Sequence, residues 1–388
     1  MQKHIPAVLM RGGTSRGLFF QRSDLPADPC VRDAVLLAAY GSPDPDGRQT
    51  DGVGGGIPTA SKVAIISPSE SAEYDVVYQF GQIAIDRPVV DYTSNCGNIS
   101  AAVGPFAVDE GLVPPQEPVT LVRIHQQNTD TLIVAEVPVK NGRFNEAGSY
   151  SITGVPGCGA RICLRFVSPG GAKTGKLFPT GNVLDSLNLS GFEEIPLTII
   201  DAANPLILAR AADLGVAGIE IEEMDRNVRL RQRLEAIRCA VAVKIGLART
   251  PQQATQSGQT IPKIALVAEP QSYNTTSGRV IAAAEMDLWA RIMSMGRLHP
   301  TYALSGAVAT AGAAMIPGTV AFGMVRPEAR RLQVLRIGHP GGPLEVRTHV
   351  EVGATADAHC YRYAELDRTA RRLMEGHVLV PERFFEAR

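Results

Sequence analysis

Apolar and polar residues alternate along much of the first 140 positions, a pattern that predicts short strands joined by turns. We expect strands at residues 5–11, 17–21, 62–67, 74–84, 119–124 and 132–138, and a short helix at 31–40. Residues 99–108 differ, because they are almost all small and apolar and offer no polar face. A helix of this kind is buried on all sides, so we expect it inside a core.

The second half of the chain predicts a similar set of elements. Strands are expected at residues 197–200, 206–209, 263–268, 332–337 and 344–350, and helices at 226–247 and 286–295. In the first of these helices Leu230, Leu234, Ile237 and Val241 are spaced by four, three and four residues, which is typical of an amphipathic helix. Residues 304–311 are again small and apolar.

Two stretches half a chain apart resemble each other. Cys96-Gly97 and Ser305-Gly306 each place a small nucleophile-type residue and a glycine ahead of a helix of small residues. Internal duplication would give two similar domains, each with strands wrapped around one buried helix, and both helix N-termini could face a shared cleft. The similarity taken alone is also compatible with chance.

Length and composition set the broad class. A chain of 388 residues makes two domains or one large one, and 45% hydrophobic with 20% charged residues is ordinary for a globular protein. A net charge of −1 disfavours nucleic acid as a partner. No apolar run reaches the ~18 residues of a membrane span. The six cysteines form no C-x-x-C pair, so we expect no metal site, free thiols and a cytoplasmic protein.

Lys62 and Cys96 are the candidate catalytic residues, each set near glycine-rich sequence. Lys62 follows the run 51–56, which holds four glycines, and Cys96 stands at the start of the small-residue helix. The positive end of a helix dipole favours a thiolate, and exposed backbone N–H groups beside glycine can hold a carboxylate. A lysine held near such a site can lose its proton and act as a base. These features indicate proton transfer on an anionic substrate without a cofactor.

Less specific interpretations of the same residues remain open. Lys62 could be an ordinary lysine at a strand edge, and Cys96 could be a small core residue, as free cysteines commonly are. The run 170–176 has P-loop spacing up to Lys176, but Leu177 replaces the required Ser or Thr, which disfavours nucleotide binding. His299 precedes a proline in a turn and is either structural or a substrate-positioning residue.

Many ordered blocks of the chain resemble the PrpF-like isomerases, a family with the diaminopimelate-epimerase fold. The matching blocks are Met10–Ser15, Gly41–Asp44, Asp51–Gly55, Ser61-Lys62, Asn95–Asn98, Lys176–Asn182, Asn204-Pro205, Ser294–His299 and Gly338–Gly342. Members of this family isomerise methylitaconate, 2-methylaconitate or 4-oxalomesaconate. The stretch 171–177 is most similar to the methylitaconate Δ-isomerase type.

The resemblance implies an α+β fold of two pseudo-symmetric domains, each a strongly curved mixed sheet around a central helix, with the active site in the cleft between them. Residues 1–185, completed by 376–388, would form the N-terminal domain, and residues 186–375 the C-terminal domain. Lys62 would be the catalytic lysine and Cys96 the cysteine of the catalytic site. The expected substrate-binding residues are Gly12, Gly13, Thr14, Ser15, Ser61, Asn95, Gly97, Asn98, Asn204, Ser305, Gly306 and His339.

Two departures from the family pattern bear on mechanism. Arg16 stands where family members often have lysine, and Ser305 lies where the classical epimerases of the fold carry a second cysteine. The second departure disfavours two-cysteine racemisation and favours an allylic proton shift in a small unsaturated di- or tricarboxylate. The alternatives are an epimerase or racemase of an amino or hydroxy acid, and a carboxylate-binding protein without catalysis. We expect a homodimer or a higher homo-oligomer.

Overall fold

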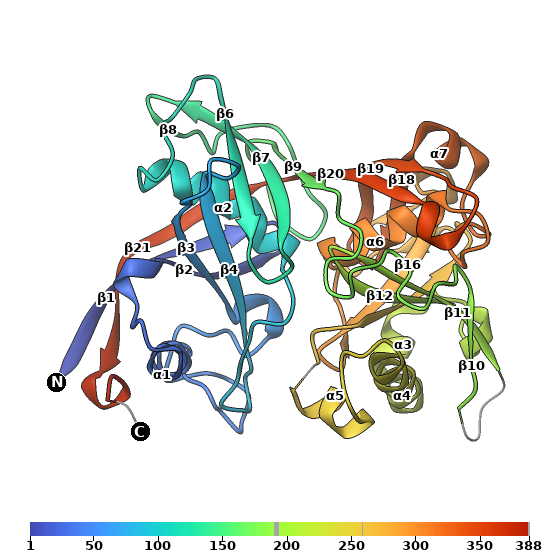
Figure 1. Ribbon diagram of the computed structural model, residues 1–388, viewed down its shortest axis with the longest axis horizontal. Coiled ribbons are helices and arrows are strands. Elements are labelled where there is room, and N and C mark those ends of the chain that lie inside the picture. Colours follow the sequence, from blue (N-terminus) through green and yellow to red (C-terminus); the bar gives the residue numbers. More distant parts are fainter. Residues whose placement is uncertain (190–193, 258, 387–388) are drawn as a thin grey trace. The chain divides into compact units, whose positions relative to one another are not determined.

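The computed structural model describes residues 1–189, 194–257 and 259–386. Contacts divide the chain into two units, Met1–Leu164 with Asp367–Arg388 and Arg165–Leu366 (Figure 1). Within the described ranges no helix is both long and apolar enough to cross a lipid bilayer.

The first unit is a mixed sheet that surrounds a buried helix. Its strands include β1 (Gln2–Gly12), β2 (Ser15–Gln21), β3 (Lys62–Pro68), β4 (Val76–Ile83), β6 (Val119–Gln126) and β7 (Thr131–Lys140). Along this series the pairings alternate, antiparallel for β1–β2, β3–β4 and β6–β7 and parallel for β2–β3 and β4–β6. Every residue of α2 (Gly97–Asp109) up to Val108 is buried.

Strand alternation gives the sheet of the first unit two apolar faces. The ring of Phe19 in β2 lies 5.7 Å from that of Phe106 in α2. Its neighbours Leu18 and Phe20 point the other way, into a cluster with Val35 and Leu36 of α1 (Pro29–Tyr40). The sheet therefore lies between α2 on one face and α1 on the other.

The second unit repeats this arrangement. Its strands include β11 (Ile195–Ala202), β12 (Asn204–Arg210), β13 (Lys263–Ala268), β16 (Leu288–Ser294), β18 (Val334–His339) and β19 (Gly342–Glu351). They pair in the same alternating order, antiparallel for β11–β12, β13–β16 and β18–β19 and parallel for β12–β13 and β16–β18. All residues of α6 (Leu304–Met315) are buried, while α4 (Val228–Lys244) packs its apolar face against the sheet.

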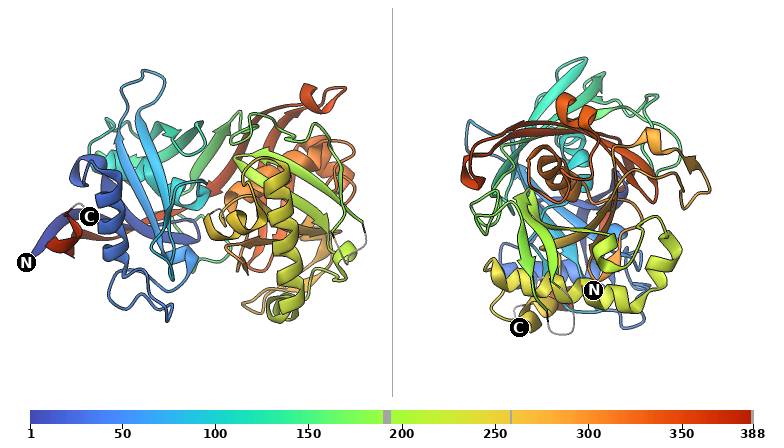
Figure 2. Two further views of the ribbon diagram at one scale, coloured as in Figure 1. Left: turned by 60° about the horizontal axis from the view of Figure 1, so that its bottom comes forward. Right: turned by 90° about the vertical axis from the view of Figure 1, so that its right-hand side faces the viewer.

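The helices occupy equivalent positions in the two units. In chain order α2 falls between β4 and β6, and α6 falls between β16 and β18. In the same way α1 separates β2 from β3, and α4 separates β12 from β13. In Figure 2 the blue α1 and the olive α4 lie on the outside of the sheets of their own units. The predicted fold class, a pair of similar α+β units each built around a central helix, is confirmed.

The unit boundaries differ from the sequence-based ones at residues 185/186 and 375/376. Strand β21 (Ala370–Pro381) pairs with β1 along its whole length, so the return to the first unit comes before residue 376. The stretch after Arg165 belongs to the second unit, because Gly170 pairs with Ala202 of β11. The last two residues of the expected segment 376–388 lie outside the described residues.

One predicted element is wrong. Residues 286–295 do not form a helix; Leu288–Ser294 are strand β16, which pairs antiparallel with β13 and parallel with β18. Six of its seven residues are buried, so this central strand has no polar face and its apolar run shows no period of two. Strands β9 (Ile162–Val167), β20 (Cys360–Arg368) and β21 were not anticipated. The other predicted helices and strands are present.

Candidate active site

Lys62 is the first residue of β3 and only 8% exposed. Its Nζ donates to Oε1 of Gln82, 2.6 Å away, and lies 5.0 Å from the ring centroid of Phe80. Its backbone carbonyl accepts a hydrogen bond from the buried hydroxyl of Tyr40, which in turn accepts from the N–H of Leu18 at 2.8 Å. The lysine is thus held at both its main chain and its amine, unlike a mobile surface lysine.

Cys96 is the N-cap residue of α2 and is half-buried. Its side chain makes no capping hydrogen bond, and its carbonyl accepts from the N–H and the hydroxyl of Ser100, both at 3.0 Å. The leading N–H groups of a helix have no partner within the helix, so the start of α2 favours an anion beside this position.

One face of β4 connects Lys62 with Cys96. Tyr78, Phe80 and Gln82 alternate along this strand, so their side chains point to the same side. Gln82 and Phe80 contact the amine of Lys62. At the other end burial, together with the neighbouring Cys96, raises the pKa of Tyr78 well above its usual value. The two candidate catalytic residues therefore lie along one strand face, on the side of the sheet that carries α2.

The turn between β1 and β2 packs directly on the start of α2. A Cβ on Gly12 would lie 2.3 Å from the carbonyl oxygen of Asn98, and one on Gly13 would lie 2.2 Å from its Oδ1. The side chain of Asn98 donates to the hydroxyl of Thr14 at 3.1 Å. Ser15 follows and is 3% exposed. The glycines are required here because any side chain would push the turn away from the helix N-terminus.

A second polar network supports the segment before Cys96. Asn95 donates to the hydroxyl of Thr129 at 3.4 Å, and Thr129 donates to Oε1 of Gln126 at 2.8 Å. Nε2 of Gln126 donates at 2.6 Å to Oδ1 of Asn128, and Nδ2 of Asn128 donates at 2.8 Å to the carbonyl of Phe80. This chain of hydrogen bonds links the Cys96 segment to the strand that carries the aromatic neighbour of Lys62.

Ser61 is fully buried and ties the lysine to the preceding loop. Its hydroxyl lies 2.6 Å from Oε1 of Gln49, which also accepts from the N–H of Gly56 at 3.0 Å. Gln49 is 1% exposed, adopts a left-handed φ of 55° and donates to the hydroxyl of Ser42 at 2.9 Å. Sequence reasoning missed both Gln49 and Gln82, because neither stands in a recognisable motif.

Arg16 is exposed on β2, one residue from Gly17, which pairs with Lys62. Its Nη2 lies 3.1 Å from the point that a Cβ on Gly55 would occupy. The guanidinium therefore lies against the glycine-rich run 52–56, beside the strand pair that carries the lysine. A planar guanidinium is well suited to bind a carboxylate.

The predicted residues of the second unit stand at the start of α6, the start of β12 and the end of β18. Ser305 and Gly306 are in the first turn of α6, and Asn204 is the first residue of β12 and 1% exposed. His339 ends β18, is 2% exposed and accepts from the N–H of Gly341 through Nδ1 at 3.0 Å. His299 similarly accepts from the N–H of Thr301 at 3.1 Å, a turn-stabilising contact.

The P-loop-like run is occupied by a side chain of the protein itself. Oδ2 of Asp201 accepts from the N–H groups of Lys173 and Thr174 at 2.8 and 2.7 Å, and from the hydroxyl of Thr174 at 2.9 Å. Burial raises the pKa of this carboxyl, although these hydrogen bonds act in the opposite direction. The backbone donors that could hold a phosphate thus hold Asp201, which agrees with the interpretation against nucleotide binding.

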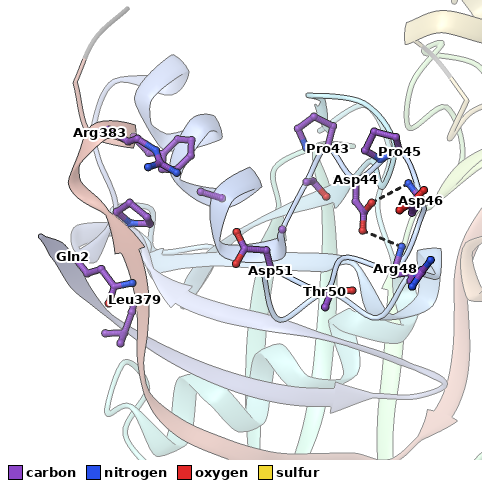
Figure 3. Close-up of a pocket in the computed structure, with 15 residues that line it drawn as sticks. Gln2, Pro43, Asp44, Pro45, Asp46, Arg48, Thr50, Asp51, Leu379 and Arg383 are labelled. Atoms are coloured by element: carbon purple, nitrogen blue, oxygen red, sulfur yellow. Dashed lines mark hydrogen bonds between the residues drawn. The ribbon is translucent and has the colours of Figure 1, made fainter.

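A separate surface hollow of the first unit lies between the loop 41–51 and the ends of β1 and β21 (Figure 3). Asp44 accepts there from the N–H groups of Asp46, Arg48 and Gln49. These bonds outweigh its partial desolvation and lower its pKa. None of the predicted site residues lines this hollow.

Comparison with known proteins places the chain in a family. Residues 2–381 match the family described as PrpF protein. This chain belongs to the PrpF family. It is 44% identical to the 3-methylitaconate isomerase of Eubacterium barkeri and 40% identical to the 2-methyl-aconitate isomerase of Shewanella oneidensis, over 98% of both chains in each case. It is 41% identical to the (4E)-oxalomesaconate Delta-isomerase of a Novosphingobium species over 97% of both chains.

Solved structures agree with this assignment. The crystal structure of methylitaconate-delta-isomerase matches with a TM-score of 0.80 and 43% identity, over 100% of this chain and 98% of that one. A hydroxyproline epimerase from Agrobacterium vitis matches with a TM-score of 0.57 and 14% identity, over 98% and 94% of the two chains, which shows a shared fold alone. The predicted PrpF resemblance is confirmed, and this PrpF protein is an isomerase.

Proposed function

We propose that this PrpF protein moves a C=C double bond in a small unsaturated di- or tricarboxylate, such as methylitaconate, methylaconitate or oxalomesaconate. Lys62 is the acid/base residue and Cys96 is part of the catalytic site. The observation that carries this proposal is the placement of a buried, anchored lysine amine and a cysteine at a helix start along one face of β4. The named activities of relatives at 40–44% identity support the same reaction class.

The reaction needs one proton transfer in each direction. Lys62, as the free amine, takes a proton from the allylic carbon, and the electron pair spreads through the C=C bond into the carboxylate to give a dienolate. The ammonium of Lys62 then returns a proton to the other end of the allyl unit, which completes the shift of the double bond. Rotation within the intermediate, followed by return of the proton to the carbon that it left, would instead give cis–trans isomerisation. A general base of this kind typically contributes ~10²–10⁴-fold to the rate.

Backbone donors stabilise the charge that develops in the intermediate. The N–H groups of Gly97 and Asn98 open α2, where the helix dipole favours an anion. The turn Gly12–Ser15 packs on the same helix start, so its polar groups can bind a substrate carboxylate beside Cys96. This chemistry uses protein groups alone, and we propose that it runs without a cofactor.

The test is a panel of itaconate, aconitate and oxalomesaconate analogues, followed by NMR in water and in deuterated water. We expect double-bond migration on at least one unsaturated acid. The alternative, an epimerase or racemase, would instead show α-proton exchange with inversion on an amino or hydroxy acid and no migration. Neither reaction on any panel member, together with tight binding of the acids, would point to a non-catalytic carboxylate-binding protein.

We further infer a reducing cytoplasmic setting and a homo-oligomeric state. All six cysteines are free thiols, two of them exposed, which suits a reducing compartment. Light scattering on the purified protein measures the oligomeric state directly, and a monomeric mass would contradict this part of the proposal.

A further inference from the structure

Gln82 stands directly opposite Lys62 in the β3–β4 ladder. Its side chain is 3% exposed, and its Oε1 accepts from the lysine Nζ at 2.6 Å. The Lys62 side chain is buried as well, so its amine cannot turn away into solvent. The nearby amide of Gln82 therefore limits the direction in which the amine can point.

The orientation of the Gln82 amide is set by its other partners. Its Nε2 donates to the carbonyl of Ser61 at 2.9 Å and to the carbonyl of Pro58 at 3.1 Å. Both partners can only accept, so the NH₂ group must face them and the oxygen must face Lys62. The side chain of Gln82 therefore holds two groups at once: the backbone just before Lys62, and the amine of Lys62.

A neutral acceptor is suited to a lysine that must change its protonation state. The amide oxygen accepts an N–H from an ammonium and from a free amine alike, so the contact survives loss of the proton. The lone pair of the free amine then points away from Gln82. A carboxylate at this position would instead stabilise the ammonium and oppose its deprotonation.

The second unit provides an internal comparison. Lys263 opens β13 as Lys62 opens β3, and it is also buried. The register that pairs Ile264 with Met293 continues to Ser294, so a serine stands opposite Lys263 in the ladder. Its Nζ donates at 2.8 Å to the carbonyl of Thr260 in the preceding loop. The glutamine clamp is thus not a general requirement for a buried lysine at this point of the fold.

We propose that Gln82 is a positioning residue for Lys62: it holds the amine in place while leaving the proton free to move. This inference rests on the proposed role of Lys62 as the acid/base. The decisive variants are Gln82→Leu, which removes both donor and acceptor, and Gln82→Glu, which keeps an oxygen opposite the amine and adds a negative charge. Gln79→Leu is the matched control, since Gln79 lies on the same strand but bonds Arg22 instead.

The expected results separate kcat from KM. A misplaced catalytic group can cost about 10²-fold, so Gln82→Leu should lower kcat by about 10- to 100-fold with KM changed less than about threefold. Gln82→Glu should be nearly inactive at neutral pH and regain activity at higher pH, with the rising limb of its pH–kcat profile shifted upward by about 1–2 units. Gln79→Leu should match the wild type in both respects.

A measurement that needs no substrate separates this inference from the proposed function. The rate at which acetic anhydride acylates Lys62, followed by mass spectrometry across pH, should show the same upward shift in Gln82→Glu. If Lys62→Ala stays active, the proposed function fails whatever Gln82 does. If Lys62→Ala is inactive but Gln82→Leu and Gln82→Glu keep wild-type kcat, pH profile and acylation, the positioning role is overturned. If Gln82→Leu does not fold, the pH–kcat profile of Gln82→Glu tests the positioning role by itself.

Discussion

Lys62 and Lys263 occupy the same place in the two units, each as the first residue of the strand that pairs in parallel with the strand before it. The topology is therefore the same around both lysines, but the groups that contact their amines differ. The amine of Lys62 meets a side-chain amide and an aromatic ring, whereas that of Lys263 bonds a loop carbonyl. Two units with the same strand order thus place different partners around equivalent lysines.

Replacement of the candidate base tests the proposed function most directly. Lys62→Ala should reduce kcat by ~10²–10⁴-fold, because the proton acceptor is lost. Circular dichroism and thermal melting should show a folded protein. Lys140→Ala is the matched control, since Lys140 is an exposed strand lysine of the same unit. Retention of more than half of the wild-type activity by Lys62→Ala would rule out this mechanism.

Alkylation tests the setting of Cys96. If Cys96 is part of the catalytic site, iodoacetamide should modify it faster than the other five cysteines. Cys30 is the relevant comparison, since it is exposed and is the second residue of α1. A bound dicarboxylate should protect Cys96 and leave Cys30 unprotected, as mass-spectrometric mapping would show. Equal labelling of Cys96 with and without the ligand would count against the site.

The two helix starts should differ in their contribution to catalysis. Ser305→Ala should cost much less activity than Cys96→Ala, because alanine keeps the backbone N–H at the start of α6. If one base carries the proton, early product formed in deuterated water should contain less than full deuterium. Full incorporation together with an inactive Ser305→Ala enzyme would establish a two-residue mechanism instead.

The glycine turn between β1 and β2 should tolerate no side chain. Gly13→Ala places a Cβ 2.2 Å from Oδ1 of Asn98 in a backbone with φ of 49°, so it must displace the asparagine that holds Thr14. We expect a loss of roughly 1–3 kcal/mol in stability and a raised KM. Gly111→Ala shares a positive φ, 70°, but has nothing within 4 Å, and it isolates the backbone strain. If Gly13→Ala and Gly111→Ala changed KM equally, the turn between β1 and β2 would have no part in substrate binding.

The loop held by Asp201 should respond to pH in a defined direction. Burial raises the pKa of this carboxyl, so the folded protein keeps its proton at pH values where the unfolded chain has lost it. The free energy of unfolding of the wild type therefore falls as pH rises and Asp201 must ionise. Asp201→Asn cannot ionise, so its stability relative to wild type should rise over the same pH interval. Chemical unfolding between about pH 4 and pH 7 measures this difference.

Asp75 provides the opposite sign as a control. Partial burial raises its pKa, but the hydrogen bonds from Arg123 lower it more, so its folded pKa lies below the usual value. The ionised Asp75 carboxylate stabilises the folded protein at pH values above its usual pKa, and this stabilisation is lost as pH falls. Asp75→Asn lacks it, so the variant should become less stable than wild type as pH rises. If both variants followed the same pH trend, the assignment of the Asp201 shift to burial would be wrong.

The sequence alone determined the elements whose signal is local. Alternation located most strands, and the apolar spacing of α4 and the small residues of α2 and α6 located those helices, because periodicity and side-chain size act within a few neighbouring positions. The glycine and cysteine context of Lys62 and Cys96 singled out these two residues for the same reason. Their catalytic roles remain predictions.

Only the tertiary structure decided features that depend on distant pairing. Strand β16 is buried on both faces between partners far along the chain, so its apolar run has no strand period. Gln82 acts on Lys62 across a ladder, and Asp201 fills a loop whose sequence resembles a phosphate site. No local pattern marks a glutamine or an aspartate for such a contact, because its partner is set by strand register and not by neighbours in sequence.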